Sequence, residues 1–261
     1  MSKPLRVFIT GATSGLGEAL AAHYARQGAC LGLLSRRGER LSAFAAAHPA
    51  VPIRCYPVDV RDHAALQAAA QDFIAHHGAP DVVIASAGVS AGTVTGASDL
   101  AVFARVMEIN YLAMVATFEP FVAACRDARR GTLVGIASVA GVRGLPGAGA
   151  YSASKAAVMR YLESLRVELR GSGVSVVTIA PGYIRTPMTD VNPYRMPFLT
   201  DAEVFARRAA RAIAARRRFV VIPWPMRVVA ALLHGLPRWL YDLAFARAPR
   251  KPRLPPADAP H

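Results

Sequence analysis

A doubly wound α/β fold, with a mainly parallel seven-stranded sheet and helices on both faces, is the architecture that this sequence predicts. Short apolar runs alternate along the chain with longer stretches of helical periodicity, as expected when each strand is followed by a crossover helix. The runs are hydrophobic at nearly every position, which is typical of strands buried on both faces. A glycine-rich turn joins the first run to the first helix, as in the first strand–turn–helix unit of such folds.

The elements follow one another in order from the N-terminus. Seven strands are expected at residues 5–9, 30–34, 51–56, 81–85, 132–136, 174–179 and 219–222. Helices are expected from the glycine turn to about residue 27 and over residues 40–47, 64–76, 100–129, 151–170 and 201–218. Thr200 is expected to cap the last of these helices, with Glu203 completing a capping box.

The length of 261 residues suits one large α/β domain. Residues 1–222 carry all the expected strands and are expected to form that domain. Residues 223–247 are expected to be an apolar and basic helical extension of it. The Pro-rich residues 248–261 are expected to be a disordered tail.

The composition excludes several classes of protein. Hydrophobic residues make up 53% of the chain, which excludes a disordered protein. The apolar run near the N-terminus is too short for a signal peptide. The three cysteines, Cys30, Cys55 and Cys125, are scattered along the chain and match neither a metal site nor a disulfide framework, so a reducing cytoplasm is the expected location. No metal is therefore expected.

The net charge of +14 is concentrated toward the C-terminus, where residues 200–261 hold 12 basic and 4 acidic residues. Nucleic acid is not expected as a ligand, because no reading module or ladder of aromatic residues accompanies the charge. An anionic cofactor, an anionic substrate, a membrane surface and a solvated basic surface are all compatible with it.

The first chemical signal is the glycine-rich turn between Thr10 and Gly17. Gly11 permits a tight turn, Gly15 lets the backbone approach a pyrophosphate, and Gly17 lets the helix pack closely on the strand. The N-terminus of the helix then offers free N–H groups and the positive end of its dipole to phosphates. The position of the turn in the first strand–helix–strand unit predicts a dinucleotide site.

The end of the second strand, Ser35-Arg36-Arg37, bears on the choice of dinucleotide. A site selective for NAD would carry an acidic residue here for the ribose 2′-hydroxyl, and none is present. Arg36 offers instead a planar cation that can bind a 2′-phosphate. The position therefore favours NADP(H).

A third signal combines Ser138, at the end of the fifth strand, with Tyr151 and Lys155. Positions i and i+4 share one face of a helix, so the Lys155 ammonium is expected beside the Tyr151 phenol. A neighbouring cation should lower the pKa of Tyr151 from about 10 and make its hydroxyl usable for general acid/base catalysis. Ser138 would hold the reacting oxygen.

Together these motifs resemble the short-chain dehydrogenase/reductase family, in its compact single-domain branch with a Rossmann-like fold. The resemblance runs from about residue 5 to residue 222 and includes the family's Asp-Val pair at Asp59-Val60 and its helix asparagine at Asn110. The family's Asn-Asn-Ala-Gly after strand four appears here as Ala-Ser-Ala-Gly at residues 85–88. Both asparagines are replaced, and we expect Ser86 to supply a substitute hydrogen bond.

The resemblance implies a catalytic set of Asn110, Ser138, Tyr151 and Lys155. It implies that Tyr151 protonates a carbonyl oxygen, while a hydride passes between the nicotinamide and the carbonyl carbon. Ser138 would bind the same oxygen and Lys155 the nicotinamide ribose, and Asn110 would anchor a water that relays protons to Lys155. The protein would supply orientation and proton transfer to chemistry that belongs to the cofactor.

The residues expected to bind the cofactor, NADP(H), come from the ends of five strands and from the helix that carries Tyr151 and Lys155. They are Thr10, Gly11, Thr13, Ser14, Gly15, Leu16, Gly17, Ser35, Arg36, Asp59, Val60, Ser86, Ala87, Gly88, Tyr151, Lys155, Pro181, Gly182, Ile184 and Thr186. The family's nicotinamide-contacting threonine corresponds to Thr186.

Two segments bear on the substrate. Residues 183–199 contain Met188, Tyr194, Met196 and Phe198 with three prolines, which predicts a partly apolar lid. Residues 223–247 are leucine-rich, with tryptophans and flanking arginines. They suit peripheral membrane contact or a lipid-like substrate, and equally an extra helical pair that covers the cleft or a subunit interface.

The expected function is an NADP(H)-dependent reductase or reversible dehydrogenase of a small-molecule or lipid-like carbonyl substrate, with a 3-keto lipid favoured by residues 223–247. The family resemblance implies a homodimer or homotetramer. The alternative is a catalytically silent, cofactor-sensing regulator on the same scaffold. The intact Tyr151–Lys155 pair favours the enzyme.

Overall fold

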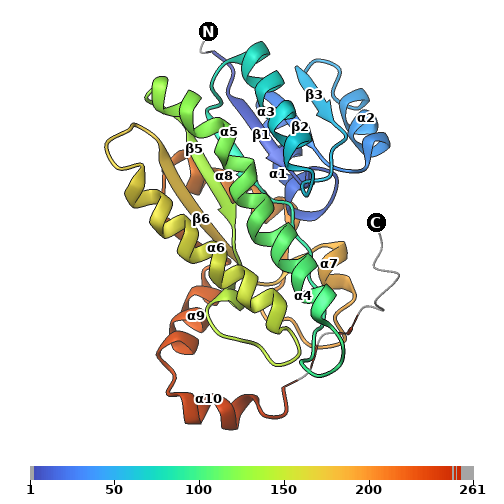
Figure 1. Cartoon of the computed structure of the whole chain (residues 1–261), viewed down its shortest axis with the longest axis vertical. Coiled ribbons are helices and arrows are strands. Elements are labelled where there is room, and N and C mark those ends of the chain that lie inside the picture. Colours follow the sequence, from blue (N-terminus) through green and yellow to red (C-terminus); the bar gives the residue numbers. More distant parts are fainter. Residues whose placement is uncertain (1–2, 249, 251, 254–261) are drawn as a thin grey trace.

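The computed structural model describes residues 3–248, 250 and 252–253. Over these residues, seven parallel strands form one sheet in the order β3-β2-β1-β4-β5-β6-β9. The strands are β1 (Arg6–Thr10), β2 (Cys30–Leu34), β3 (Ile53–Tyr56), β4 (Val82–Ala85), β5 (Thr132–Ile136), β6 (Ser175–Pro181) and β9 (Phe219–Ile222). The predicted doubly wound fold is confirmed (Figure 1).

Helices cover both faces of the sheet because alternate strand residues point to opposite sides. In β1, Phe8 packs with α3 (His63–His77), α5 (Ala113–Asp127) and α6 (Gly149–Glu168). Its neighbours Val7 and Ile9 pack with α1 (Gly15–Arg26), α2 (Gly38–Ala46) and α8 (Ala202–Ala214) on the other face. Figure 1 shows α3, α5 and α6 in front of the sheet and α8 behind it.

The strand order reverses between β1 and β4, which are neighbours in the sheet. From β1 the chain winds outward to β2 and β3, then returns to β4 and continues to the other edge. The loops after β1 and β4 therefore separate at their carboxyl ends and leave a crevice, which is the usual ligand position in such sheets.

The long helix predicted over residues 100–129 is interrupted. The structure has α4 (Leu100–Met107), a π-helical turn (Glu108–Leu112) and α5 in its place. Amphipathic periodicity continues through a π turn, so the pattern did not reveal it. The turn contains Asn110, and single π turns are often found at functional sites.

Among the described residues, one helical run, Leu100–Asp127, has the length and apolar composition that a membrane-crossing helix needs. Phe118 and Phe121 within it are fully buried in the core that it shares with α3 and α6. We therefore assign it to the fold as a helix that packs one face against the core.

The predicted capping box at Thr200 is wrong. Thr200 and Asp201 form the short strand β8, which pairs with β7 (Ile184–Arg185). Helix α8 begins at Ala202, one residue after the predicted start. Its N-cap residue is Asp201, whose side chain makes no cap bond and pairs with Arg185 instead. The β7–β8 pair joins the two ends of the loop at residues 186–199, a tertiary contact that the local pattern of Thr200 and Glu203 does not contain.

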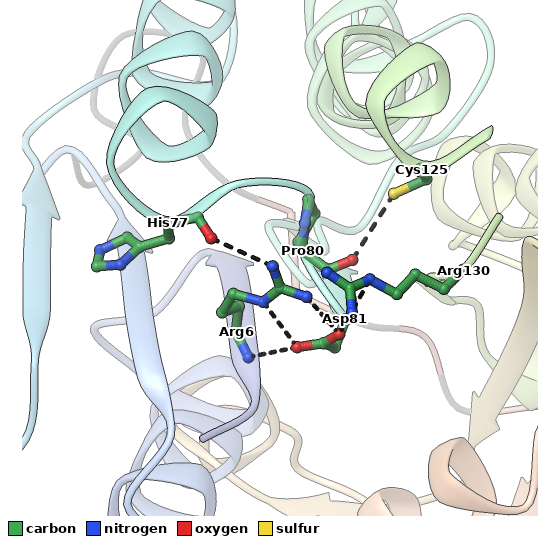
Figure 2. A network of polar contacts seen from close by, with 6 residues as sticks. All are labelled: Arg6, His77, Pro80, Asp81, Cys125 and Arg130. Atoms are coloured by element: carbon green, nitrogen blue, oxygen red, sulfur yellow. Dashed lines mark hydrogen bonds and ion pairs between the residues drawn. The ribbon is translucent and has the colours of Figure 1, made fainter. Parts of the chain in front are cut away.

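The amino ends of β1 and β4 are tied together by an ion pair between buried Arg6 and partly buried Asp81 (Figure 2). The Arg6 guanidinium donates to both Asp81 oxygens, at 2.7 and 3.0 Å, and the Arg6 backbone N–H donates to the same carboxylate. Arg6 also donates to the carbonyl of His77, and Arg130 lies 3.9 Å from Asp81. This network lies at the end of the sheet opposite the crevice, so its role is structural.

After β9 the chain forms α9 (Pro225–Gly235) and α10 (Arg238–Phe245), which Figure 1 shows at the end of the molecule far from the N-terminus. Helix α9 packs on β9 through Met226 and Ala230, both buried. Part of the predicted tail, residues 249, 251 and 254–261, lies outside the described residues. Arg253, which is described, forms a 2.7 Å ion pair with Asp99.

Candidate active site

The predicted site residues line one groove across the carboxyl ends of the strands, from β2 at one end to β6 at the other. Nineteen of the twenty expected cofactor residues border its two connected parts. The exception is Thr10, which is buried behind the wall and whose hydroxyl accepts a 3.4 Å hydrogen bond from the Ala87 N–H. The groove lies at the reversal of strand order, where the topology places a ligand site.

The glycine turn packs too closely against its own backbone and the loop after β4 to hold larger residues. A Cβ on Gly17 would lie 2.2 Å from the carbonyl oxygen of Gly11, which is closer than van der Waals contact allows. Gly15 has a φ of +55°, in the left-handed region that favours glycine. The N-cap Ser14 makes no side-chain cap bond, and α1 begins directly behind it with its N-terminus toward the groove. These features fit a diphosphate.

Arginines surround the far end of the groove. Arg36 and Arg37 both border it, together with Ser35, Asp59 and Val60. Arg36 lies 3.9 Å from the Asp59 carboxylate. Arg37 was not among the predicted residues, yet its guanidinium donates to both the hydroxyl and the carbonyl of Thr13, each at 3.1 Å. The adjacent Arg36, which was predicted, is the sequence feature that could have indicated Arg37.

The carboxylate at this end is held ionised. Hydrogen bonds from the Arg61 side chain lower the pKa of Asp59, and burial opposes them with a smaller effect. Arg36 lowers the pKa further through its charge. Asp59 is therefore charged when it accepts these hydrogen bonds. Its single negative charge does not balance the positive charges of Arg36, Arg37 and Arg61.

Tyr151, Ser138 and Lys155 meet at the other end of the groove. Helix α6 presents Tyr151 and Lys155 one turn apart, as predicted, and Ser138 stands two residues beyond β5. The Lys155 Nζ is buried, lies 5.8 Å from the centroid of the Tyr151 ring and donates a 2.8 Å hydrogen bond to the carbonyl of Ile136. The Ser138 hydroxyl accepts from the Ala140 N–H.

The expected lowering of the Tyr151 pKa is not found. Burial raises the pKa of Tyr151, and a hydrogen bond with Ser138 only partly offsets this. Burial also lowers the pKa of Lys155 to about 8. The physical reason is desolvation, which penalises the phenolate and the ammonium alike. Tyr151 is therefore a neutral phenol at neutral pH, which is the form that donates a proton.

Asn110 lies behind this end of the groove and does not border it. Its amide Oδ1 accepts from the Val89 N–H at 2.8 Å, and its Nδ2 donates to the Val89 carbonyl and to the Ser154 hydroxyl. The side chain is completely buried. These bonds fix the loop after β4 against α6, one residue from Lys155.

The loop after β4 also corrects the expectation for Ser86. Within the described residues, the side-chain bond between this loop and β1 is donated by the Ala87 N–H to the Thr10 hydroxyl oxygen, and Ser86 does not make it. Ser86 borders the groove itself. A Cβ at Gly88 would lie 3.3 Å from Asn110 Oδ1, so a larger residue there would press on the side chain that fixes this loop.

A second, mostly apolar cavity opens beside Ser138 and Tyr151 and shares the wall formed by Pro181 and Gly182. Its apolar lining comes from the loop after β5, from the predicted lid and from the C-terminal helices: Val139, Leu145, Tyr183, Met188, Tyr194, Pro197, Val229, Leu233 and Phe245. Residues 186–199 of the lid begin with the short helix α7 (Pro187–Asp190). Of the predicted lid residues, Met188 and Tyr194 face the cavity, whereas Phe198 is exposed.

Comparisons with known proteins agree with this geometry. The family model of short chain dehydrogenases matches residues 6–195. An uncharacterized oxidoreductase of Myxococcus xanthus (strain DK1622) is 35% identical over 241 residues, covering 92% of this chain and 95% of that protein.

Two solved structures have the same fold. A short chain dehydrogenase/reductase from Burkholderia phymatum in complex with NAD superposes with a TM-score of 0.82 at 25% identity, covering 97% of this chain and 98% of that one. An alcohol dehydrogenase from the archaeon Thermococcus sibiricus, complexed with 5-hydroxy-NADP, superposes with a TM-score of 0.75 at 22% identity over 84% and 96% of the two chains. The former is described with NAD and the latter with an NADP derivative.

Proposed function

This chain is an oxidoreductase of the short-chain dehydrogenase/reductase family, and we propose that it uses NADP(H) to interconvert a carbonyl compound and a secondary alcohol. The observation that supports the proposal most directly is the meeting of Tyr151, Ser138 and Lys155 where the glycine-lined groove joins the apolar cavity. We assign residues 1–222 to the catalytic domain and residues 223–247 to a helical extension that completes the cavity.

The groove fits a nicotinamide dinucleotide, because Gly11, Gly15 and Gly17 let the turn fold tightly and bring the backbone at the start of α1 to the groove. When bound, that cofactor supplies the hydride exchanged with the substrate carbon. The glycine turn and Ser14 would hold its diphosphate, Asp59 and Val60 its adenine, and Ile184 and Thr186 its nicotinamide amide.

The neutral Tyr151 hydroxyl would donate its proton to the substrate oxygen in the reducing direction. Ser138 would hydrogen-bond the same oxygen, and the Lys155 ammonium would bind the nicotinamide ribose and stabilise the resulting phenolate. Asn110 would keep the loop after β4 and helix α6 in register and anchor the water that returns a proton to Lys155. The arrangement favours reduction near neutral pH, because the phenol is already protonated there.

Selectivity for NADP(H) is supported by the arginines at the far end of the groove. Arg36 and Arg37 both border the position expected for the 2′-phosphate. Guanidinium groups bind phosphate through charge-assisted hydrogen bonds. Arg40 adds charge nearby through its 3.1 Å bond to the Thr13 carbonyl.

The substrate we propose is a lipid-like ketone, such as a 3-keto acyl chain. Aliphatic and aromatic side chains form most of the wall, as expected for an apolar ligand. We further propose a cytoplasmic homodimer or homotetramer, which light scattering would test.

The Tyr151→Phe variant tests the catalytic assignment. It should lose turnover by about three orders of magnitude, since general acid/base catalysis contributes on that scale, while NADPH binding measured by fluorescence stays within about twofold. Tyr161→Phe is a matched control, because Tyr161 lies on the same helix in the core and away from the groove. A panel of ketones with NADPH and NADH provides the assay.

Retained activity in Tyr151→Phe would overturn the mechanism. Faster turnover with NADH would overturn the choice of cofactor. A wild-type protein that binds NADPH but reduces no member of a panel of small aldehydes, steroids, acyl thioesters and 3-keto lipids would favour the cofactor-sensing regulator.

A further inference from the structure

The outer face of α9 and α10 exposes five large apolar side chains. We define this outer apolar surface as Trp224, Val228, Leu232, Trp239 and Leu243, which are between 51% and 72% exposed. Trp224, Val228 and Leu232 follow one another at intervals of four residues, as do Trp239 and Leu243, so each helix presents one continuous stripe to solvent. Five large apolar side chains exposed within residues 224–243 favour an interaction site.

The same two helices are apolar on their inner sides as well. Met226 and Ala230 anchor α9 to the body, and Val229 and Leu233 line the apolar cavity. In α10, Phe245 lines the cavity, and the Tyr241 hydroxyl donates to the carbonyl of Gly144. Burial against the protein therefore explains the inner faces only, and the outer apolar surface needs another partner.

The charges around the outer apolar surface favour an anionic partner. Arg227, Arg238 and Arg247 are exposed on this segment, and Asp242 is the acidic residue among positions 223–248. A two-fold contact with a second copy would bring these arginines against one another, which is unfavourable. An anionic lipid surface attracts them, and the chain's net charge of +14 adds to the attraction.

The residue types fit the region between lipid headgroups and acyl chains. Tryptophan prefers that region because its ring is apolar and its N–H is polar. The long arginine side chains can reach the phosphates while their methylenes stay in the apolar zone. Helices of this pattern lie in the plane of the membrane surface, because they are too short to cross it.

We infer that α9 and α10 dock this protein onto an anionic phospholipid bilayer through the outer apolar surface, with both helices lying in the interface. The inner faces of the docked helices line the apolar cavity beside Tyr151. A lipid-like ketone would then pass between the bilayer and the cavity without crossing water, a consequence that rests on the proposed function.

The chain carries its own reporter for this docking. It contains two tryptophans, and both belong to the outer apolar surface. On vesicles of mixed phosphatidylcholine and phosphatidylglycerol, tryptophan emission should shift to shorter wavelength, and brominated lipids in the vesicles should quench it. The full chain should sediment with these vesicles and less with pure phosphatidylcholine, and high salt should weaken the binding. Unchanged emission with the protein left in the supernatant would overturn the proposal.

The double variant Leu232→Ser/Leu243→Ser tests the surface itself and keeps both tryptophans. It should weaken vesicle partitioning by about tenfold or more, because two apolar side chains no longer enter the membrane. The matched control is Leu100→Ser/Val167→Ser, which removes two exposed apolar side chains from α4 and α6. The control should bind vesicles as the wild type does, and equal losses in both variants would overturn the assignment.

Two further arms separate this proposal from its alternatives. Tyr151→Phe should bind vesicles as the wild type does, so an inactive enzyme that still binds supports docking and leaves the catalytic proposal to its own test. Leu232→Ser/Leu243→Ser should keep its activity on a water-soluble ketone, because neither leucine borders the cavity. A blue shift that follows protein concentration without vesicles, and that the same double variant abolishes, would identify the partner as a second copy and overturn the membrane proposal.

Discussion

The Lys155 ammonium donates a 2.8 Å hydrogen bond to the carbonyl oxygen of Ile136, the last residue of β5. This bond holds the ammonium over the end of the sheet, 5.8 Å from the centroid of the Tyr151 ring. The ammonium is almost completely buried, and the hydrogen bond does not replace its lost hydration, so burial lowers its pKa to about 8. The Lys155 ammonium borders the groove, so a ligand there can contact it. The loss of its charge with rising pH should be visible in the rate of the reaction.

Reduction should slow as the pH rises through about 8. Below that pH Lys155 is charged and can bind the ribose and stabilise the Tyr151 phenolate; above it the charge is lost. Tyr151 does not cause this decline, because burial raises its pKa and keeps the phenol protonated. The measurement is kcat/KM for a ketone from pH 6 to pH 10 under saturating NADPH.

The Lys155→Arg variant is the control for that profile. An arginine stays charged across the whole range, so the decline near pH 8 should disappear from whatever activity remains. A decline of the same position and size in Lys155→Arg would assign it to another group.

Lys155 should destabilise the fold at neutral pH. The folded pKa of about 8 lies below the ordinary value of 10.5. Between these values the unfolded chain binds more protons than the folded one, so the lysine's contribution to stability rises with pH and is least favourable below 8. Lys155→Met should therefore raise the free energy of unfolding at pH 7 by about 1–3 kcal/mol, with loss of turnover.

Urea unfolding of both proteins at pH 7 and pH 9.5 measures this effect. The stability difference between variant and wild type should shrink at the higher pH, because wild-type Lys155 is then largely neutral in the folded state. A variant that is less stable than wild type by the same amount at both pH values would show that the ammonium does not carry a burial penalty.

Much of the fold could be predicted from the sequence because the signals are local. Strands β2, β5 and β9 begin and end where the apolar runs do. The glycine turn follows β1, and the four-residue spacing puts Tyr151 and Lys155 on one face of α6. The strand order then brings the turn and this helix to the same groove. The sheet brings Ser138 and Gly88 to the same edge because β4 and β5 are parallel neighbours.

The features that the sequence did not predict depend on contacts between distant residues. Thr200 is part of a strand because it pairs with Ile184, and no local pattern contains that pairing. The raised pKa of Tyr151 results from burial by the surrounding elements, whereas helical spacing indicated only the neighbouring lysine. The role of Arg37 depends on Thr13, which lies 24 residues earlier in the chain.

Arg37 should contribute to the preference for NADPH. Arg37→Leu should raise the KM for NADPH by about tenfold and leave the KM for NADH within about twofold, because a charge-assisted bond to the 2′-phosphate is lost. Arg160→Leu is a suitable control, since Arg160 is an exposed arginine on α6 that pairs with Glu163. Equal increases for both cofactors would show instead that Arg37 acts only by bracing Thr13.

The Arg6–Asp81 pair should contribute to stability without affecting the active site. Asp81→Asn leaves Arg6, whose side chain is 6% exposed, without its full counter-charge. Removing one partner of a buried pair costs about 3–5 kcal/mol, and Arg6 keeps its bond to the His77 carbonyl, so we expect about 2–4 kcal/mol. The control is Asp201→Asn, whose pair with Arg185 is exposed, with an expected loss below about 1 kcal/mol.

The stabilisation by the Arg6–Asp81 pair should depend on pH, and the lowered pKa of Asp81 sets the direction. Burial alone would raise the pKa of Asp81, but the hydrogen bonds and charge of Arg6 outweigh it and lower the pKa below its usual value. The stabilisation is therefore complete above the unfolded pKa of about 4 and is lost as the pH falls through the lower folded value. Urea unfolding at pH 7 and pH 3 should show the gap between wild type and Asp81→Asn narrowing at pH 3. A gap of the same size at both pH values would mean that the variant acts through packing and not through the charge of Asp81.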